Sequence, residues 1–125
     1  MRRQIPCAYQ HPLQPLIASS MEKNTPVIWI DGRNRISHYG FSQEEIAWMK
    51  THVFFARIDR AYDMLDLGQR LCYHSLLHQR PILLVTGIPA LLAGFSPDEK
   101  KHWERQWERC LARLRERTSD IILEG

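Results

Sequence analysis

Short runs of apolar residues, separated by segments of helical periodicity, constrain the fold of this chain most strongly. The runs are VIWI at 27–30, HVFFA at 52–56 and ILLV at 82–85, and a shorter run, DIIL, follows at 120–123. Continuous apolar runs bounded by turn residues are typical of strands that are buried on both faces of a parallel sheet. We therefore predict an α/β fold, a mostly parallel sheet of about four strands with helices on both faces.

Helical patterns fill the intervals between these runs. Pro15 and the segment LIASSMEKN predict a first helix, and Ser42 with Glu45 forms a capping box that opens a second one. Small and apolar residues recur at helical spacing over about 60–78. Ser96 starts a last helix with proline at its first position and Glu99 at its third, which predicts another capping box. One apolar stripe runs along this last helix and consists of Trp103, Trp107, Cys110, Leu111 and Leu114.

The length and composition fit one globular domain. A chain of 125 residues, of which 44% are hydrophobic and 25% are charged, can build one core but not two. We expect an irregular N-terminal segment over 1–12, which contains two prolines, and a single domain over 13–125. No apolar run approaches the about 20 residues that span a bilayer, and no apolar core follows Arg2 and Arg3, so we expect a cytoplasmic protein without membrane contact.

Neither the cysteines nor the histidines form a recognisable metal or catalytic motif. Cys7, Cys72 and Cys110 make no CxxC pair, so we expect reduced thiols, with Cys72 and Cys110 acting as small apolar residues of their helices. His74 and His78 are four apart on a predicted helix, but HSLLH lacks the glutamate of the metalloprotease motif and a third ligand. We therefore expect no metal and no cofactor.

The nucleotide-binding fingerprints of α/β proteins are missing from the sequence. None of the six glycines is followed by lysine, and no GxGxxG occurs. The sequence also contains no GxSxG nucleophile elbow, which argues against nucleophilic catalysis.

Charged residues gather where the predicted strands end, and ligands of open parallel sheets bind beyond these carboxyl ends. The strand ends carry Asp31, Arg57, Asp59, Thr86 and Glu124. Positive charge beside aromatic rings suits contact with phosphates and bases, and the candidates are Arg33, Arg35, His38, Arg57 and Arg60. In the alternative interpretation, each arginine pairs with a nearby acid such as Asp31, Asp59 or Asp63.

The last helix mixes charges of both signs. Its arginines are Arg105, Arg109, Arg113, Arg115 and Arg117, and its glutamates are Glu104, Glu108 and Glu116. Such mixing is typical of a solvated helix face and less typical of a nucleic-acid stripe. We expect Trp103 and Trp107 in the core, with contact to a partner protein as the alternative.

Three segments resemble the RecA-like ATPase core of the RecA and RadA recombinases. VIWIDGRNRI resembles the strand that ends in an aspartate and opens the catalytic loop, and HVFFARIDRAYDMLDLGQRL resembles the next strand and its helix. PILLVTGIPALLAGF resembles the Walker B strand, and the likeness extends over about 13–124. It implies a partial RecA-like fold of the P-loop NTPase type.

The chain departs from this family at the residues that would hydrolyse ATP. Asp31 ends the first strand, but Arg33 stands at the catalytic glutamate position and Thr86 at the Walker B aspartate position. Arginine cannot act as a base, and threonine brings no negative charge to magnesium. The phosphate loop would precede the segment matching 13–31, so we expect it to be absent, which leaves an inner strand edge open. Residues 3–9 or a partner would cover that edge, unless the chain is a shortened form of a longer ATPase.

The resemblance and these departures imply a non-catalytic accessory protein of DNA recombination or repair. We expect such a protein to bind a recombinase-type partner, single-stranded DNA or both, and an oligomer is compatible with this role. A structural or regulatory protein-interaction domain without a nucleic-acid role is the first alternative. An enzyme that uses Asp31, His38 and Asp59 is the second.

Overall fold

The computed structural model describes residues 13–32 and 40–124 and has an α/β fold, as predicted. Four parallel strands form one sheet in the order β2-β1-β3-β4. Their bounds are β1 (Val27–Gly32), β2 (Val53–Ile58), β3 (Ile82–Thr86) and β4 (Asp120–Glu124). The predicted irregular segment over 1–12 lies outside the described residues.

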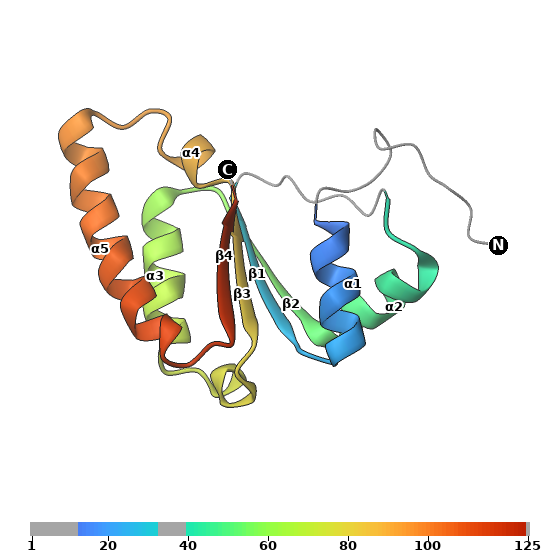
Figure 1. The fold of residues 1–125 in the computed structure, drawn as a ribbon. Coiled ribbons are helices and arrows are strands. Elements are labelled where there is room, and N and C mark those ends of the chain that lie inside the picture. The colour runs from blue at the N-terminus through green and yellow to red at the C-terminus, as the bar shows by residue number, and fades with distance from the viewer. Residues whose placement is uncertain (1–12, 33–39, 125) are drawn as a thin grey trace.

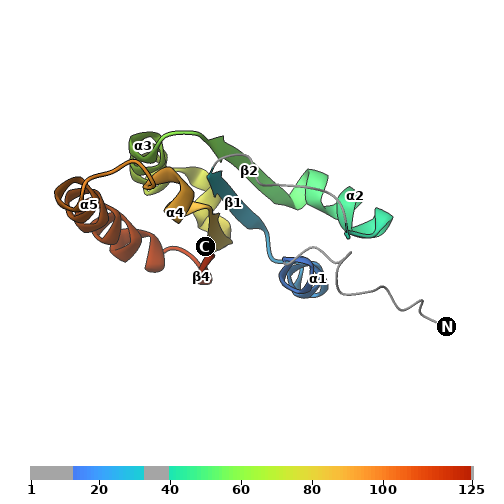
Figure 2. The same cartoon turned by 90° about the horizontal axis from the view of Figure 1, so that it is seen from above.

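Helices cover both faces of the sheet. Helices α1 (Gln14–Lys23) and α2 (Gln43–His52) lie on one face, and α3 (Ala61–Leu71) and α5 (Pro97–Arg115) lie on the other (Figures 1 and 2). The short α4 (Ile88–Leu91) follows the carboxyl end of β3, and a 3₁₀-helix, η2 (Ser75–Gln79), precedes β3. Within the described residues, no helix combines the length and apolar composition needed to cross a bilayer.

The sheet separates two apolar cores because successive side chains of a strand point to opposite faces. Ile28, Ile30 and Leu83 pack with α3 and α5, whereas Trp29 and Leu84 pack with α1 and α2. The predicted stripe of α5 is confirmed, since all five of its members are buried. Its indole rings stack on each other at 5.5 Å, and Trp103 Nε1 donates a hydrogen bond to the Ala61 carbonyl at 2.7 Å.

Both predicted capping boxes are present. The Ser42 hydroxyl accepts from the Glu45 backbone N–H at 3.0 Å, and the Glu45 carboxylate accepts from the Ser42 N–H at 2.8 Å. Ser96 and Glu99 cap α5 in the same reciprocal way. These motifs involve residues three apart, so the sequence alone locates the starts of α2 and α5.

Two sequence predictions are wrong. The run at 52–56 is not a strand buried on both faces, because β2 lies at an edge of the sheet and Phe54 is 43% exposed. The helix predicted over about 60–78 ends at Leu71. A new 3₁₀-turn then begins, in which His74 Nδ1 accepts from the Leu76 N–H and Leu77 is buried against the core.

A glycine sets the distance between α3 and α5. A Cβ atom added to Gly68 would lie 2.7 Å from Cys110 Sγ and 3.2 Å from the Trp107 ring. Both distances are shorter than an ordinary van der Waals contact, so only glycine lets the two helices pack this closely.

Replacing Gly68 by alanine should therefore lower the free energy of unfolding. Overpacking destabilises a core by about 1–3 kcal/mol, whereas the higher helix propensity of alanine stabilises the helix by at most about 1 kcal/mol. Gly94→Ala is the matched control, since a Cβ there meets nothing within 4 Å. Urea denaturation of both variants tests this, and a Gly68→Ala protein as stable as Gly94→Ala would contradict it.

Candidate functional site at the carboxyl edge of the sheet

Four polar residues lie in register where the parallel strands end. Asp31 of β1 is opposite both Arg57 of β2 and Thr86 of β3, and Thr86 is opposite Glu124 of β4. We call these four residues the polar row. Each lies two positions after an apolar residue on the α1–α2 side of the sheet, so the row continues that face beyond the core.

The centre of the polar row is buried and internally hydrogen-bonded. Asp31 and Thr86 are 1% and 7% exposed. The Thr86 hydroxyl donates to Asp31 Oδ1 at 2.6 Å and accepts from Trp29 Nε1 at 3.2 Å. A hydroxyl can donate one hydrogen bond. Thr86 donates it to the buried carboxylate of Asp31 and so has none left for a ligand. This Trp29–Thr86–Asp31 chain compensates for burying the carboxylate beside the core.

The β2 end of the polar row presents positive charge on an aromatic platform. Arg57 is exposed, and its Cζ lies 5.8 Å from the centroid of the Phe55 ring. Phe55 in turn meets the Trp29 ring edge-on at 6.0 Å. Aromatic packing therefore connects the exposed guanidinium to the Trp29–Thr86–Asp31 chain.

Carboxylates do not neutralise the arginines at this edge within the described part of the chain. Among the described residues, the ion pair that the structure shows joins Arg70 to Asp66, on the exposed surface of α3 and away from this edge. Arg57 and Arg60 have no carboxylate oxygen of a described residue within 4.0 Å. Pairing of these two arginines with Asp59 or Asp63, the alternative raised from the sequence, is therefore not seen.

The last residue of β1, Gly32, touches Gly87, the residue that follows β3. Gly87 has a φ of 81°, and a Cβ atom there would lie 2.3 Å from the Gly32 carbonyl oxygen. The Gly87 N–H donates to the Glu124 carbonyl at 3.2 Å, which holds this turn against β4. Gly32 and Gly87 therefore bring the backbones of β1 and β3 close together just after the centre of the polar row.

The structure describes some of the predicted site residues, and others lie outside the described part of the chain. Arg33, Arg35 and His38 lie outside the described residues, so their placement stays a prediction. Arg57 belongs to the polar row, and Arg60 is the exposed N-cap residue of α3. Asp31 and Thr86, which the resemblance predicts as degenerate ATPase positions, are adjacent and hydrogen-bonded, and the sequence does not reveal that Trp29 joins them.

The remaining candidates lie away from this edge or are inside the fold. Trp103 and Trp107 are 1% and 4% exposed, so their rings are buried in the core, as expected. His74 and His78 are exposed and do not share an α-helical face. Within 13–32 and 40–124, no three histidine, cysteine or acidic side chains come together as metal ligands would.

Replacing Thr86 by valine should destabilise the protein. Valine keeps the methyl packing but removes the donor to Asp31 and the acceptor for Trp29, and each unsatisfied buried group costs about 1–3 kcal/mol. Thr86→Ser is the complementary control, because it keeps the hydroxyl and loses one methyl group, worth about 1 kcal/mol. Guanidinium denaturation should show Thr86→Val as the less stable variant, and the reverse order would contradict the role of the hydroxyl.

No protein-family model matches the chain, and a search of curated proteins found no significant match.

Proposed function

We propose that the protein is a non-catalytic RecA-like accessory factor of DNA recombination or repair. It binds single-stranded DNA, a recombinase-type partner or both at the carboxyl edge of the sheet. One observation carries this proposal: the centre of the polar row is buried, whereas its β2 end is exposed and positively charged. The acid and hydroxyl at the centre bond to each other, whereas Arg57 faces solvent without an acid partner among the described residues.

The side chains at the centre support the non-catalytic part of the proposal. ATP hydrolysis of the RecA type needs a carboxylate that helps to hold magnesium and a base that activates water. Thr86 stands at the first of these positions and Arg33 at the second. Asp31 is an acid, but it is 1% exposed and accepts a hydrogen bond from the Thr86 hydroxyl.

The basic end supports contact with nucleic acid. Arginine on an aromatic ring presents a fixed positive charge together with a flat surface, the combination that contacts phosphates and stacks on unpaired bases. Arg57 has this environment on Phe55, and Arg60 adds a second exposed guanidinium three residues later. The net charge of the chain, +3, permits such binding.

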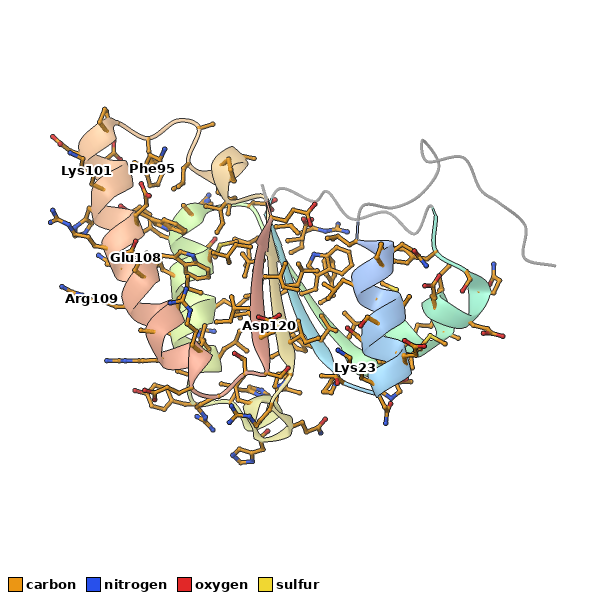
Figure 3. The ribbon with its side chains drawn as sticks, in the orientation of Figure 1. Lys23, Phe95, Lys101, Glu108, Arg109 and Asp120 are labelled. Carbon is orange, nitrogen blue, oxygen red and sulfur yellow. The ribbon has the colours of Figure 1, made fainter. Side chains whose placement is uncertain are left out.

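Fluorescence anisotropy of labelled single-stranded DNA tests this function. We expect binding at low salt that weakens as salt rises and does not depend on ATP, because each phosphate contact releases counterions. Arg57→Ala should weaken binding and reduce the slope of log affinity against log salt by about one. Arg109→Ala is the matched control, since Arg109 is an exposed arginine that projects from α5 (Figure 3).

Two outcomes would contradict DNA binding at this edge. One is the absence of binding at low salt, and the other is an equal loss of affinity in Arg57→Ala and Arg109→Ala. Thermal unfolding of each variant separates these outcomes from a loss of fold, because Arg57→Ala also removes the contact with Phe55.

The outer edge of β4 supports a second candidate function, that of a protein-interaction domain. In the described part of the chain, β4 pairs only with β3, and Leu123 is 49% exposed. A groove of about 680 Å³ lies beside it, lined by residues of α4, α5 and β4 that include Ile88, Leu92, Phe95, Leu111 and Leu123. An unpaired strand edge beside an apolar groove favours addition of a strand from another chain.

If β4 pairs with a second copy, sedimentation velocity should show a dimer at high protein concentration. Leu123→Lys should shift it to the monomer, because lysine on an edge strand opposes pairing. Phe54→Lys is the matched control, since Phe54 is exposed to a similar degree on the opposite edge strand β2. A monomer at all concentrations, or equal effects of the two variants, would contradict pairing through β4.

A further inference from the structure

Two cysteines that are far apart in the sequence meet between α3 and α5. Cys72 ends α3 and Cys110 lies in α5, and they are 6% and 4% exposed. The two thiols line the same small hollow, and both lie against Gly68. The sequence predicts only that each is a small apolar residue of its own helix, because their contact arises only when the two helices pack.

Neighbouring groups hold the two thiols together. The Cys72 thiol also donates to the Gly68 carbonyl at 3.4 Å, and Gly68 lies against Cys110 Sγ. The Arg117 guanidinium donates to the Cys72 carbonyl and so ties the end of α3 to the chain just after α5. The pair is therefore fixed from both helices, and its contact needs no movement of either helix.

A small polar hollow gives solvent access to the pair. It has a volume of about 300 Å³, and its walls are Gln69 of α3, Gln106, Arg109 and Arg113 of α5, and the two cysteines. The hollow is large enough for a small polar oxidant. The lining residues belong to α3 and α5 or directly follow α3. These two helices lie beside the sheet (Figure 1), whereas the polar row belongs to the strand ends.

We propose that Cys72 and Cys110 form a reversible modification site, at which a small peroxide converts the thiol pair into a disulfide that links α3 to α5. In the first step a cysteine sulfur attacks the peroxide. An S–O bond forms, the O–O bond breaks, and the departing oxygen leaves as water. In the second step the other sulfur attacks the sulfenic acid, an S–S bond forms, the S–O bond breaks, and a second water leaves. Two thiols lose two electrons and two protons, and the peroxide is reduced to two waters.

The environment of Cys110 assigns the order of the two steps. Burial, and next the contact with Cys72, raise the pKa of the Cys110 thiol to about 12. At neutral pH Cys110 therefore stays protonated and is a poor first nucleophile. We assign the first attack to Cys72 and the second to Cys110.

Disulfide mapping of the wild-type chain tests this site, since the chain has three cysteines and hence three pairings. Native protein is treated with hydrogen peroxide, quenched with catalase, denatured, alkylated and digested with trypsin for mass spectrometry. We expect predominantly the Cys72–Cys110 pair, with Cys7 alkylated and the link removed by dithiothreitol. The same treatment in urea should give a mixture of pairings, because the native contact is lost.

Two variants test the order of the steps and the contact. Cys110→Ser removes the second nucleophile, so peroxide should leave Cys72 as a sulfenic acid that reacts with dimedone. Cys72→Ser should give much less of this adduct at Cys110. Full alkylation of both cysteines after native oxidation would overturn the proposal, as would the same mixture of pairings with and without urea. The urea comparison needs only wild-type protein, so it holds even if a variant fails to fold.

Discussion

The hydrogen-bonded chain from Trp29 through Thr86 to Asp31 is the interaction on which the centre of this structure depends. It joins β1 to β3, the two central strands, at the point where the apolar core ends and the polar edge begins. A carboxylate that is 1% exposed needs hydrogen-bond donors, and Thr86 supplies one from the neighbouring strand. The register that pairs Asp31 with Thr86 is therefore stabilised by polar contacts as well as by the backbone ladder.

The Trp29–Thr86–Asp31 hydrogen bonds also determine which groups at the carboxyl edge are available to a ligand. The Thr86 hydroxyl donates its hydrogen bond to Asp31, and Gly32 and Gly87 approach each other closely just after this pair. Arg57 and Arg60 remain exposed at the β2 end, without acid partners among the described residues. In the proposed function, an edge that resembles an ATPase site has become a basic surface, and the buried pair stabilises the sheet.

Much of the fold could be predicted from local patterns. The apolar runs of β1 and β3, the capping boxes of α2 and α5, and the stripe from Trp103 to Leu114 each depend on residues a few positions apart. These patterns report local conformation and burial directly.

Features that depend on packing between distant segments could not be predicted in this way. Nothing in the run at 52–56 indicates that β2 lies at a sheet edge, because strand order follows from which segments pair. The break after Leu71 depends on Leu77 reaching the core, and the Cys72–Cys110 contact depends on Gly68. At the site, the polar residues at strand ends were predicted, but their register and the role of Trp29 were not.

Phosphate release from ATP by the pure protein in the presence of Mg²⁺ tests the central claim most directly. If the centre of the polar row is a closed structural pair, turnover should equal the background without protein. Asp31→Asn should then change stability and leave this rate unaltered. Magnesium-dependent turnover that Asp31→Asn abolishes would show instead that Asp31 acts on nucleotide, and it would contradict the account.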